Sequence, residues 1–185
     1  MNKSHILLLA TFCMFSLAAL ADDTNVLKTD LGVFEAQTGT VIIKGFGQTG
    51  TLTVGTEVIT VRCKESAEAS TGKKIHGLSV DITDNVLPRE RIYVDYDELT
   101  PLLNAIDYLG KITYDASPLP GFEASFTTKS GLQVIAHSIR REGTIQTYLQ
   151  YDDHPRILLS TAQVTQFRDL IQQARNNLDS IRARK

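Results

Sequence analysis

Residues 160–181 read STAQVTQFRDLIQQARNNLDSI, and they carry the strongest structural signal in the chain. Ser160 is suited to cap a helix, and Gln163 completes a capping box, in which each side chain bonds the main-chain N–H of the other residue. An apolar stripe follows at helical spacing: Val164, Phe167, Leu170, Ile171, Ala174, Leu178 and Ile181. The pattern predicts an amphipathic helix of about five turns that is held by packing against a core.

A second helix start lies 65 residues upstream. Asp95 occupies the position equivalent to Ser160, and Glu98 the position equivalent to Gln163. An apolar stripe follows here too, formed by Leu99, Leu102, Leu103, Ile106 and Leu109, and Gly110 is a natural stop. Pro101 fits a helix only in its first turn, so a shorter helix capped by Thr100 is the alternative.

Short runs rich in Val, Ile, Thr and Phe, mostly with period-two alternation, precede each helix and predict β-strands. The first group comprises Leu31–Ala36, Thr40–Phe46, Gly50–Val54, Glu57–Glu65, Lys74–Thr83 and Arg91–Val94. The second comprises Lys111–Asp115, Phe122–Thr127, Leu132–Arg140, Thr144–Gln150 and Arg156–Leu159. We therefore predict an α+β domain over residues 31–185, with antiparallel sheets and two amphipathic helices. Residues 31–110 and 111–185 would be two similar strand–helix halves of that domain.

This order of elements, several strands and then a capped helix, twice over, resembles the single-stranded-nucleic-acid-binding folds of the Whirly type. The resemblance rests on element order alone and involves no shared motif. It implies layered antiparallel sheets with helices, and it suggests single-stranded nucleic acid as one ligand class to consider. Function does not follow from a fold, so the chemistry of particular residues has to decide.

Residues 1–21 have the pattern of a cleaved signal peptide. Lys3 provides the positive charge, Ile6 to Leu20 is an apolar run, and Ala19 and Ala21 are the small residues that precede a cleavage site. The alternative is an N-terminal membrane anchor, but a membrane span needs about 20 apolar residues. We expect export to the periplasm or the extracellular space, with residues 22–30 forming a flexible segment ahead of the domain.

Composition narrows the classes of protein. With 42% apolar and 22% charged residues, the chain is not collagen-like, a long coiled coil or wholly disordered. Export would remove one lysine from 19 basic and 21 acidic residues, which leaves 164 residues with a net charge of −3. That mild acidity makes nucleic acid an improbable partner. Cys63 would then be the remaining cysteine; we expect a buried apolar residue, with an intermolecular disulfide or a reactive thiol as alternatives.

Motifs for catalysis or cofactors are weak. Residues 45–50, GFGQTG, match the dinucleotide-binding pattern Gly-x-Gly-x-x-Gly, but a strand-like run follows where a phosphate-binding helix is required. We therefore expect a glycine-rich hairpin turn there and predict no cofactor. His76, His137 and His154 are isolated in sequence, so no metal site is predicted and no catalytic residue is assigned.

Three functions remain open. The first is an exported, non-enzymatic binding or accessory protein whose partner is a protein or a small molecule. The second is a hydrolase-type enzyme whose site is assembled from distant residues, with His76, His137 and the loop Asp152–His154 as candidates. The third is a single-stranded nucleic-acid binder that stacks bases on some of the six tyrosines. The sequence leaves the oligomeric state open.

Overall fold

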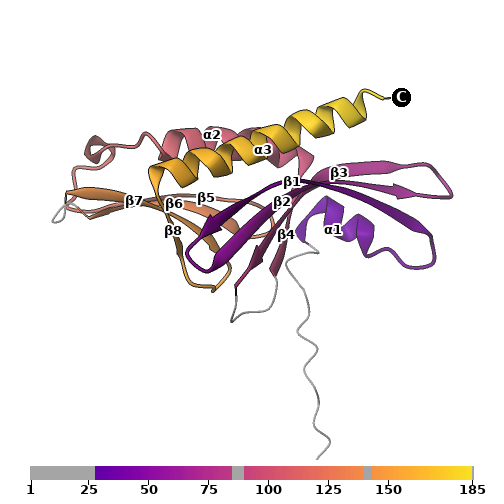
Figure 1. The fold of residues 1–185 in the computed structure, drawn as a ribbon, viewed down its shortest axis with the longest axis horizontal. Helices are drawn as coiled ribbons and strands as arrows, with labels where there is room; N and C mark the ends of the chain where they lie inside the picture. Colours follow the sequence, from indigo (N-terminus) through magenta and orange to yellow (C-terminus); the bar gives the residue numbers. More distant parts are fainter. Residues whose placement is uncertain (1–27, 85–89, 140–142, 185) are drawn as a thin grey trace, which may run out of the picture.

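The computed structural model describes residues 28–84, 90–139 and 143–184, and it contains two four-stranded antiparallel sheets (Figure 1). The first sheet has the order β1-β2-β3-β4, formed by Ile42–Val54, Glu57–Glu68, Lys74–Thr83 and Glu90–Asp95. The second has the order β5-β6-β7-β8, formed by Glu123–Thr127, Leu132–Ile139, Thr144–Tyr151 and Ile157–Leu159. Each sheet is followed by a long helix, α2 (Leu99–Leu109) or α3 (Thr161–Arg182). The predicted α+β fold with two similar halves is confirmed.

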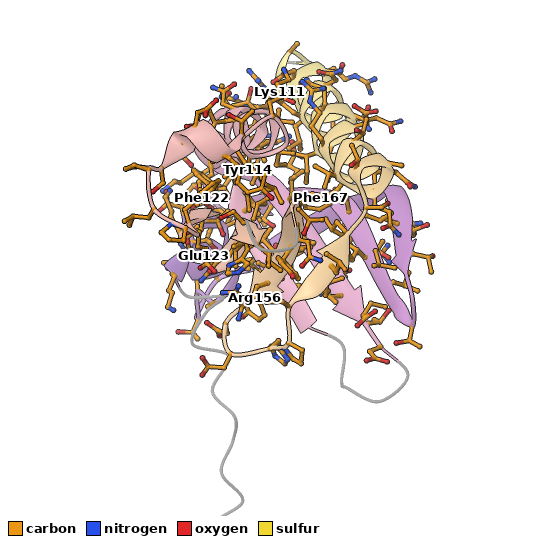
Figure 2. The ribbon with its side chains drawn as sticks, turned by 90° about the vertical axis from the view of Figure 1, so that its left-hand side faces the viewer. Lys111, Tyr114, Phe122, Glu123, Arg156 and Phe167 are labelled. Atoms are coloured by element: carbon orange, nitrogen blue, oxygen red, sulfur yellow. The ribbon has the colours of Figure 1, made fainter. Side chains whose placement is uncertain are left out.

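The long helix of each half packs on the sheet of the other half. α3, from the second half, packs on β1 and β2 of the first sheet, whereas α2, from the first half, packs on β5 and β6 of the second sheet. The two helices also contact each other and lie side by side over the sheets (Figure 1). A single hydrophobic core results, and it contains Phe167, a residue of α3 whose side chain is 1% exposed (Figure 2). Each half therefore depends on the other for its burial of apolar surface.

Both predicted helix starts are confirmed, including their capping boxes. The Ser160 hydroxyl accepts from Gln163 N, and the Gln163 side chain bonds back to Ser160 N. Asp95 and Glu98 form the same reciprocal pair at the start of the short 3-10 turn η2 (Tyr96–Glu98), which leads into α2. Pro101 lies in the first turn of α2, where a missing N–H costs no helical hydrogen bond.

The predicted strand Leu31–Ala36 is wrong, because these residues form the helix α1 (Asp30–Glu35). The Thr29 hydroxyl caps the helix by accepting from Gly32 N. The Asp95 carboxylate accepts from Asp30 N and Leu31 N. Six residues are too few for the apolar spacing to distinguish a strand from a helix. Here the Asp95 carboxylate, distant in the sequence, favours the helix because it accepts from the free N–H groups of its first turn. Thr29 and Asp30, which were expected to belong to a flexible segment 22–30, are held by these hydrogen bonds, and residues 22–27 lie outside the described part of the chain.

β1 replaces two predicted strands and the hairpin turn expected at residues 45–50. It is one 13-residue strand with a shift in its register against β2 between Gln48 and Gly50. One extra residue accommodated as a bulge lets a strand bend without ending, which alternation alone does not reveal. The actual turn is at Gly55, whose φ of 60° suits glycine.

The predicted strand Lys111–Asp115 is also wrong. Its last residues enter a second 3-10 turn, η3 (Tyr114–Ala116), and the stretch joins neither sheet. Two prolines follow, at Pro118 and Pro120, and a proline cannot donate to a strand ladder. The second sheet instead begins at Glu123.

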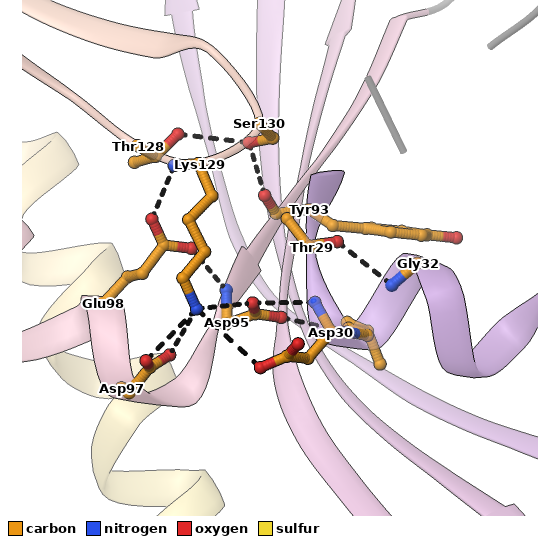
Figure 3. Close-up of polar contacts among 11 residues, drawn as sticks. Thr29, Asp30, Gly32, Tyr93, Asp95, Asp97, Glu98, Thr128, Lys129 and Ser130 are labelled. Carbon is orange, nitrogen blue, oxygen red and sulfur yellow. Dashed lines mark hydrogen bonds and ion pairs between the residues drawn. The ribbon is translucent and has the colours of Figure 1, made fainter. Parts of the chain in front are cut away.

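A polar network connects the halves (Figure 3). Lys129, in the turn between β5 and β6, places its ammonium 3.0 Å from Asp95 and 3.1 Å from Asp97. Its main-chain N–H donates to Glu98, and the neighbouring Ser130 hydroxyl donates to the carbonyl of Tyr93. Asp95 is 3% exposed and also holds the start of α1, so one buried carboxylate joins three segments.

Among the described residues, no helix combines the length and apolar character that a membrane crossing requires. The proposed signal peptide, residues 1–21, lies outside the described residues.

Candidate ligand groove

An open groove lies between the first half of β1 and the last two turns of α3, and we call it the β1–α3 groove. Its volume is about 600 Å³. The floor comes from β1 residues 45–48 and β2 residues 63–65. The helix α3 contributes the wall through Asn177, Ser180 and Ile181, and Arg184, two residues past its end, extends that wall.

Glycines shape this groove. Near its inner end, a Cβ on Gly50 would lie 2.5 Å from Leu170 Cδ2, so glycine allows α3 to pack closely there. Farther along β1, a Cβ on Gly47 would meet nothing within 4 Å, and Gly45 lies on the same face by alternation. The helix therefore contacts the strand at one end, and the floor at the other end is bare main chain.

Cys63 closes the inner end of the groove. Its side chain is 5% exposed, its thiol donates to the carbonyl of Ala174 at 3.3 Å, and Thr49 Oγ1 lies 3.3 Å from the sulfur. The predicted burial of Cys63 is confirmed. The thiol helps to position α3 on the sheet and is shielded from reagents in solvent.

Glu65 gives the floor of the groove a negative charge. Burial acts to raise its pKa, but hydrogen bonds from Lys74 and His76 outweigh that effect and lower it. His76 Nε2 lies 2.9 Å from a Glu65 oxygen, on the adjacent strand. The Lys74 ammonium lies 3.1 Å from the other oxygen. The carboxylate therefore favours its ionised form, and it pairs with the Lys74 ammonium and the His76 imidazole at one side of the floor.

The three histidines proposed for an assembled hydrolase site belong to different surroundings. His76 pairs with Glu65 in the first sheet, and His137 Nδ1 lies 3.4 Å from Glu123 in the second. His154 lies in the β7–β8 turn, where its ring stacks on Tyr151 at 5.9 Å. The structure therefore places the three imidazoles on different elements: His76 on β3, His137 on β6 and His154 in the β7–β8 turn.

A polar cluster that sequence reasoning missed crosses the second sheet. Arg156, just before β8, reaches Glu123 on β5 with a bidentate contact of 2.8 Å and 3.3 Å (Figure 2). The same guanidinium lies 5.8 Å from the Tyr148 ring. Glu123 therefore lies between Arg156 and His137. Hydrogen bonding from Arg156 lowers the pKa of Glu123, and slight burial of the carboxylate opposes this effect. The two edge strands of the sheet are thus bridged by an ion pair.

A buried polar cluster lies under α1. The Glu35 carboxylate accepts from Lys64, Ser66 and Tyr93, and the Lys64 ammonium lies 4.3 Å from the centre of the Tyr93 ring. Burial together with the nearby Glu35 charge raises the pKa of Tyr93 to about 12. The donors of this cluster are all engaged by Glu35, so the cluster fastens α1 to the sheet.

The groove and these clusters offer no arrangement for a metal ion. Across residues 28–84, 90–139 and 143–184, no three His, Cys, Asp or Glu side chains are grouped in a way that could hold one. The glycine motif 45–50 lies within β1 and is followed by more strand, not by a helix start. Its geometry therefore differs from a dinucleotide site, in which a helix N-terminus binds the pyrophosphate.

Comparison with known proteins adds no family to this description. No protein-family model matches the chain. No curated protein matches it significantly. Function is therefore inferred from the geometry of the molecule.

Proposed function

We propose that this protein is an exported, non-enzymatic binding protein that holds an extended segment of a partner polypeptide in the β1–α3 groove. The observation that carries the proposal is the bare floor of the groove beside the exposed end of α3. Its volume of about 600 Å³ falls within the range of ligand sites, roughly 300–1,000 Å³. Support for export comes from the signal-peptide pattern of residues 1–21.

The shape of the groove favours an elongated ligand. A strand forms its floor and a helix forms its wall, so the space follows the direction of the chain, as in grooves that bind extended peptides. Gly45 and Gly47 place no side chains on the floor, and main chain of a ligand can therefore approach closely.

Charge suggests which peptide fits. Arg184 is exposed at the end of the helical wall, and a guanidinium pairs well with a carboxylate. Asn177 and Ser180 supply hydrogen-bonding groups along the wall, and Ile181 supplies an apolar contact. Because the Glu65 carboxylate is paired with the Lys74 ammonium, it does not exclude an acidic ligand. We infer a segment with an acidic side chain near Arg184 and small apolar side chains over the glycines.

The test uses two pools of fluorescein-labelled decapeptides with alternating polar and apolar residues, one acidic and one lysine-rich, measured by fluorescence anisotropy. We expect the acidic pool to bind the wild-type protein more tightly. Gly47→Leu fills the floor, and Arg184→Glu reverses the charge, so each should weaken binding at least tenfold. Ala162→Leu places the same leucine side chain at an exposed position near the other end of α3 and should leave binding unchanged.

Equal binding by wild type and Gly47→Leu would refute the groove as the site. Absence of binding by both pools would refute the proposed function. The alternative functions have their own readouts on the same preparation: salt-sensitive binding of single-stranded oligonucleotides, or turnover of generic ester substrates that is lost on replacement of His137. Either result would favour that alternative over peptide binding.

A further inference from the structure

The first half of β1 is an exposed sheet edge. β1 is an outer strand, and β2 is its one strand neighbour among the described residues. Three large apolar side chains are exposed here, with Val41 at 67%, Ile43 at 59% and Phe46 at 72%. A long edge with exposed apolar residues is a template for pairing with another strand.

The direction of the main-chain groups follows from one hydrogen bond. The Val41 carbonyl accepts a hydrogen bond from Ala69 N, so the main-chain N–H and C=O groups of Val41 point toward β2. Successive residues of a strand point their main-chain N–H and C=O groups to opposite sides. The groups that point to the open edge before the bulge therefore belong to Ile42, Lys44, Phe46 and Gln48.

α3 covers the same edge beyond the bulge. There the outward carbonyls of Thr51 and Thr53 accept hydrogen bonds from the side chains of Gln166 and Gln163. In the part of the chain that the structure describes, no such contact is present on residues 42–48. The strand is thus protected along one half and offers unpaired donors and acceptors along the other.

We propose that a second copy of this chain occupies the open half of the edge. The two β1 strands pair antiparallel, centred on Gly45, and the two four-stranded sheets become one sheet of eight strands. Lys44 of each copy then lies opposite Phe46 of the other, and Ile43 lies opposite Gly47. This inference does not depend on peptide binding in the groove.

Self-complementarity favours a second copy and fixes the register. Centred on Gly45, the pairing uses all seven residues 42–48 and places each lysine beside an aromatic ring, which attracts a cation. Centred on Lys44, it would place like charges opposite each other, which is destabilising. Centred on Phe46, it would run into the bulge at Gln48 and Gly50.

The symmetry of this pairing also joins the two grooves. An antiparallel pair of sheets is related by a two-fold axis perpendicular to the sheet, so both α3 helices lie on the same face. Gly45 lies at the axis and carries no side chain on that face. The floors of the two β1–α3 grooves would therefore meet without obstruction.

Cysteine cross-linking in the full chain tests the register. In the proposed pairing the two Gly45 residues form a non-hydrogen-bonded pair, with Cα atoms about 4.5 Å apart. That separation suits a disulfide. Gly45→Cys should give a reducible covalent dimer on mild oxidation. Ile43→Cys is the matched control, because it lies opposite Ala67 and not Cys63 within its own sheet, and its own copy would lie about 13 Å along the strand. Cys63 is buried, and oxidation of the wild-type protein gives the background level of cross-linking through this native cysteine.

Two charge variants test the pairing without a cross-link. Phe46→Lys places lysine opposite Lys44 of the other copy, whereas Phe46→Glu places an acid there with the same loss of apolar surface. Over two symmetric contacts, we expect dimer dissociation constants, measured by analytical ultracentrifugation, to differ by about tenfold or more, with the lysine variant weaker. A monomeric wild type, or cross-linking of Ile43→Cys as efficient as that of Gly45→Cys, would overturn the proposal. Peptide anisotropy is a separate readout, so failure here is distinguishable from failure of the groove.

Discussion

Replacing Asp95 with alanine should test whether one buried carboxylate holds the halves and α1 together. The carboxylate accepts from Asp30 N at 2.9 Å, from Leu31 N at 3.0 Å and from the Lys129 ammonium at 3.0 Å. Each main-chain bond contributes about 1 kcal/mol. The Lys129 side chain is 39% exposed, so its ion pair is screened and contributes less than about 1 kcal/mol. The same carboxylate also caps η2 in the Asp95–Glu98 capping box, which contributes about 1 kcal/mol. We expect Asp95→Ala to lower the free energy of unfolding by about 3–4 kcal/mol.

Asp97→Ala is the matched control. Asp97 contacts the same ammonium but its side chain is 69% exposed, so its loss should cost about 0.5 kcal/mol or less. The assay is urea unfolding followed by circular dichroism at 222 nm, with a shared slope for all variants. Because the halves exchange helices, wild type should unfold in a single transition. Equal effects of the two substitutions, or separate transitions for the two halves, would refute the reasoning.

Three further outcomes follow from burial, charge and sequence. Phe167→Ala should cost about 3–5 kcal/mol in urea unfolding, whereas Leu158→Ala, at a site 49% exposed, should cost less than about 1 kcal/mol. Burial acts to raise the pKa of Glu35, but hydrogen bonding led by Lys64 lowers it. Ionised Glu35 therefore contributes its full stabilisation of the fold at pH values above 4.5, the ordinary pKa of a glutamate. That stabilisation is lost as the pH falls through the lowered pKa of Glu35 in the folded protein. In Glu35→Gln, the midpoint temperature of thermal unfolding should therefore change less with pH between about pH 3 and 6 than in wild type. N-terminal sequencing of the protein from an exporting host should begin at Asp22, and an intact N-terminus would contradict export.

Elements with a strong local pattern could be predicted from the sequence. The two capped helices and strand β3 (Lys74–Thr83) agree with expectation because caps and periodicity are local properties. Residues 31–36 could not be assigned locally, because Asp95, far away in the chain, supplies acceptors for the start of α1. The bulge in β1 was hidden for a related reason, since a register shift is a property of two strands.

The candidate groove could be foreseen only in part. The glycines at positions 45, 47 and 50 were visible, but the sequence suggested a turn, and the close approach of Leu170 to Gly50 depends on where α3 lies. The ion pair between Glu123 and Arg156 was hidden because the sheet brings its two edge strands within reach of a long side chain. A signal for the groove did exist: a glycine on every second residue of a strand-like run indicates one bare face.

Nuclear magnetic resonance mapping of the peptide site tests the central claim most directly. Labelled protein would be titrated with the acidic decapeptide pool, and amide shifts would be followed residue by residue. Binding in the β1–α3 groove predicts the largest changes at Gly45, Gly47, Asn177 and Arg184. Changes centred instead on Glu123 and the face of the second sheet, or no changes at all, would contradict the proposal.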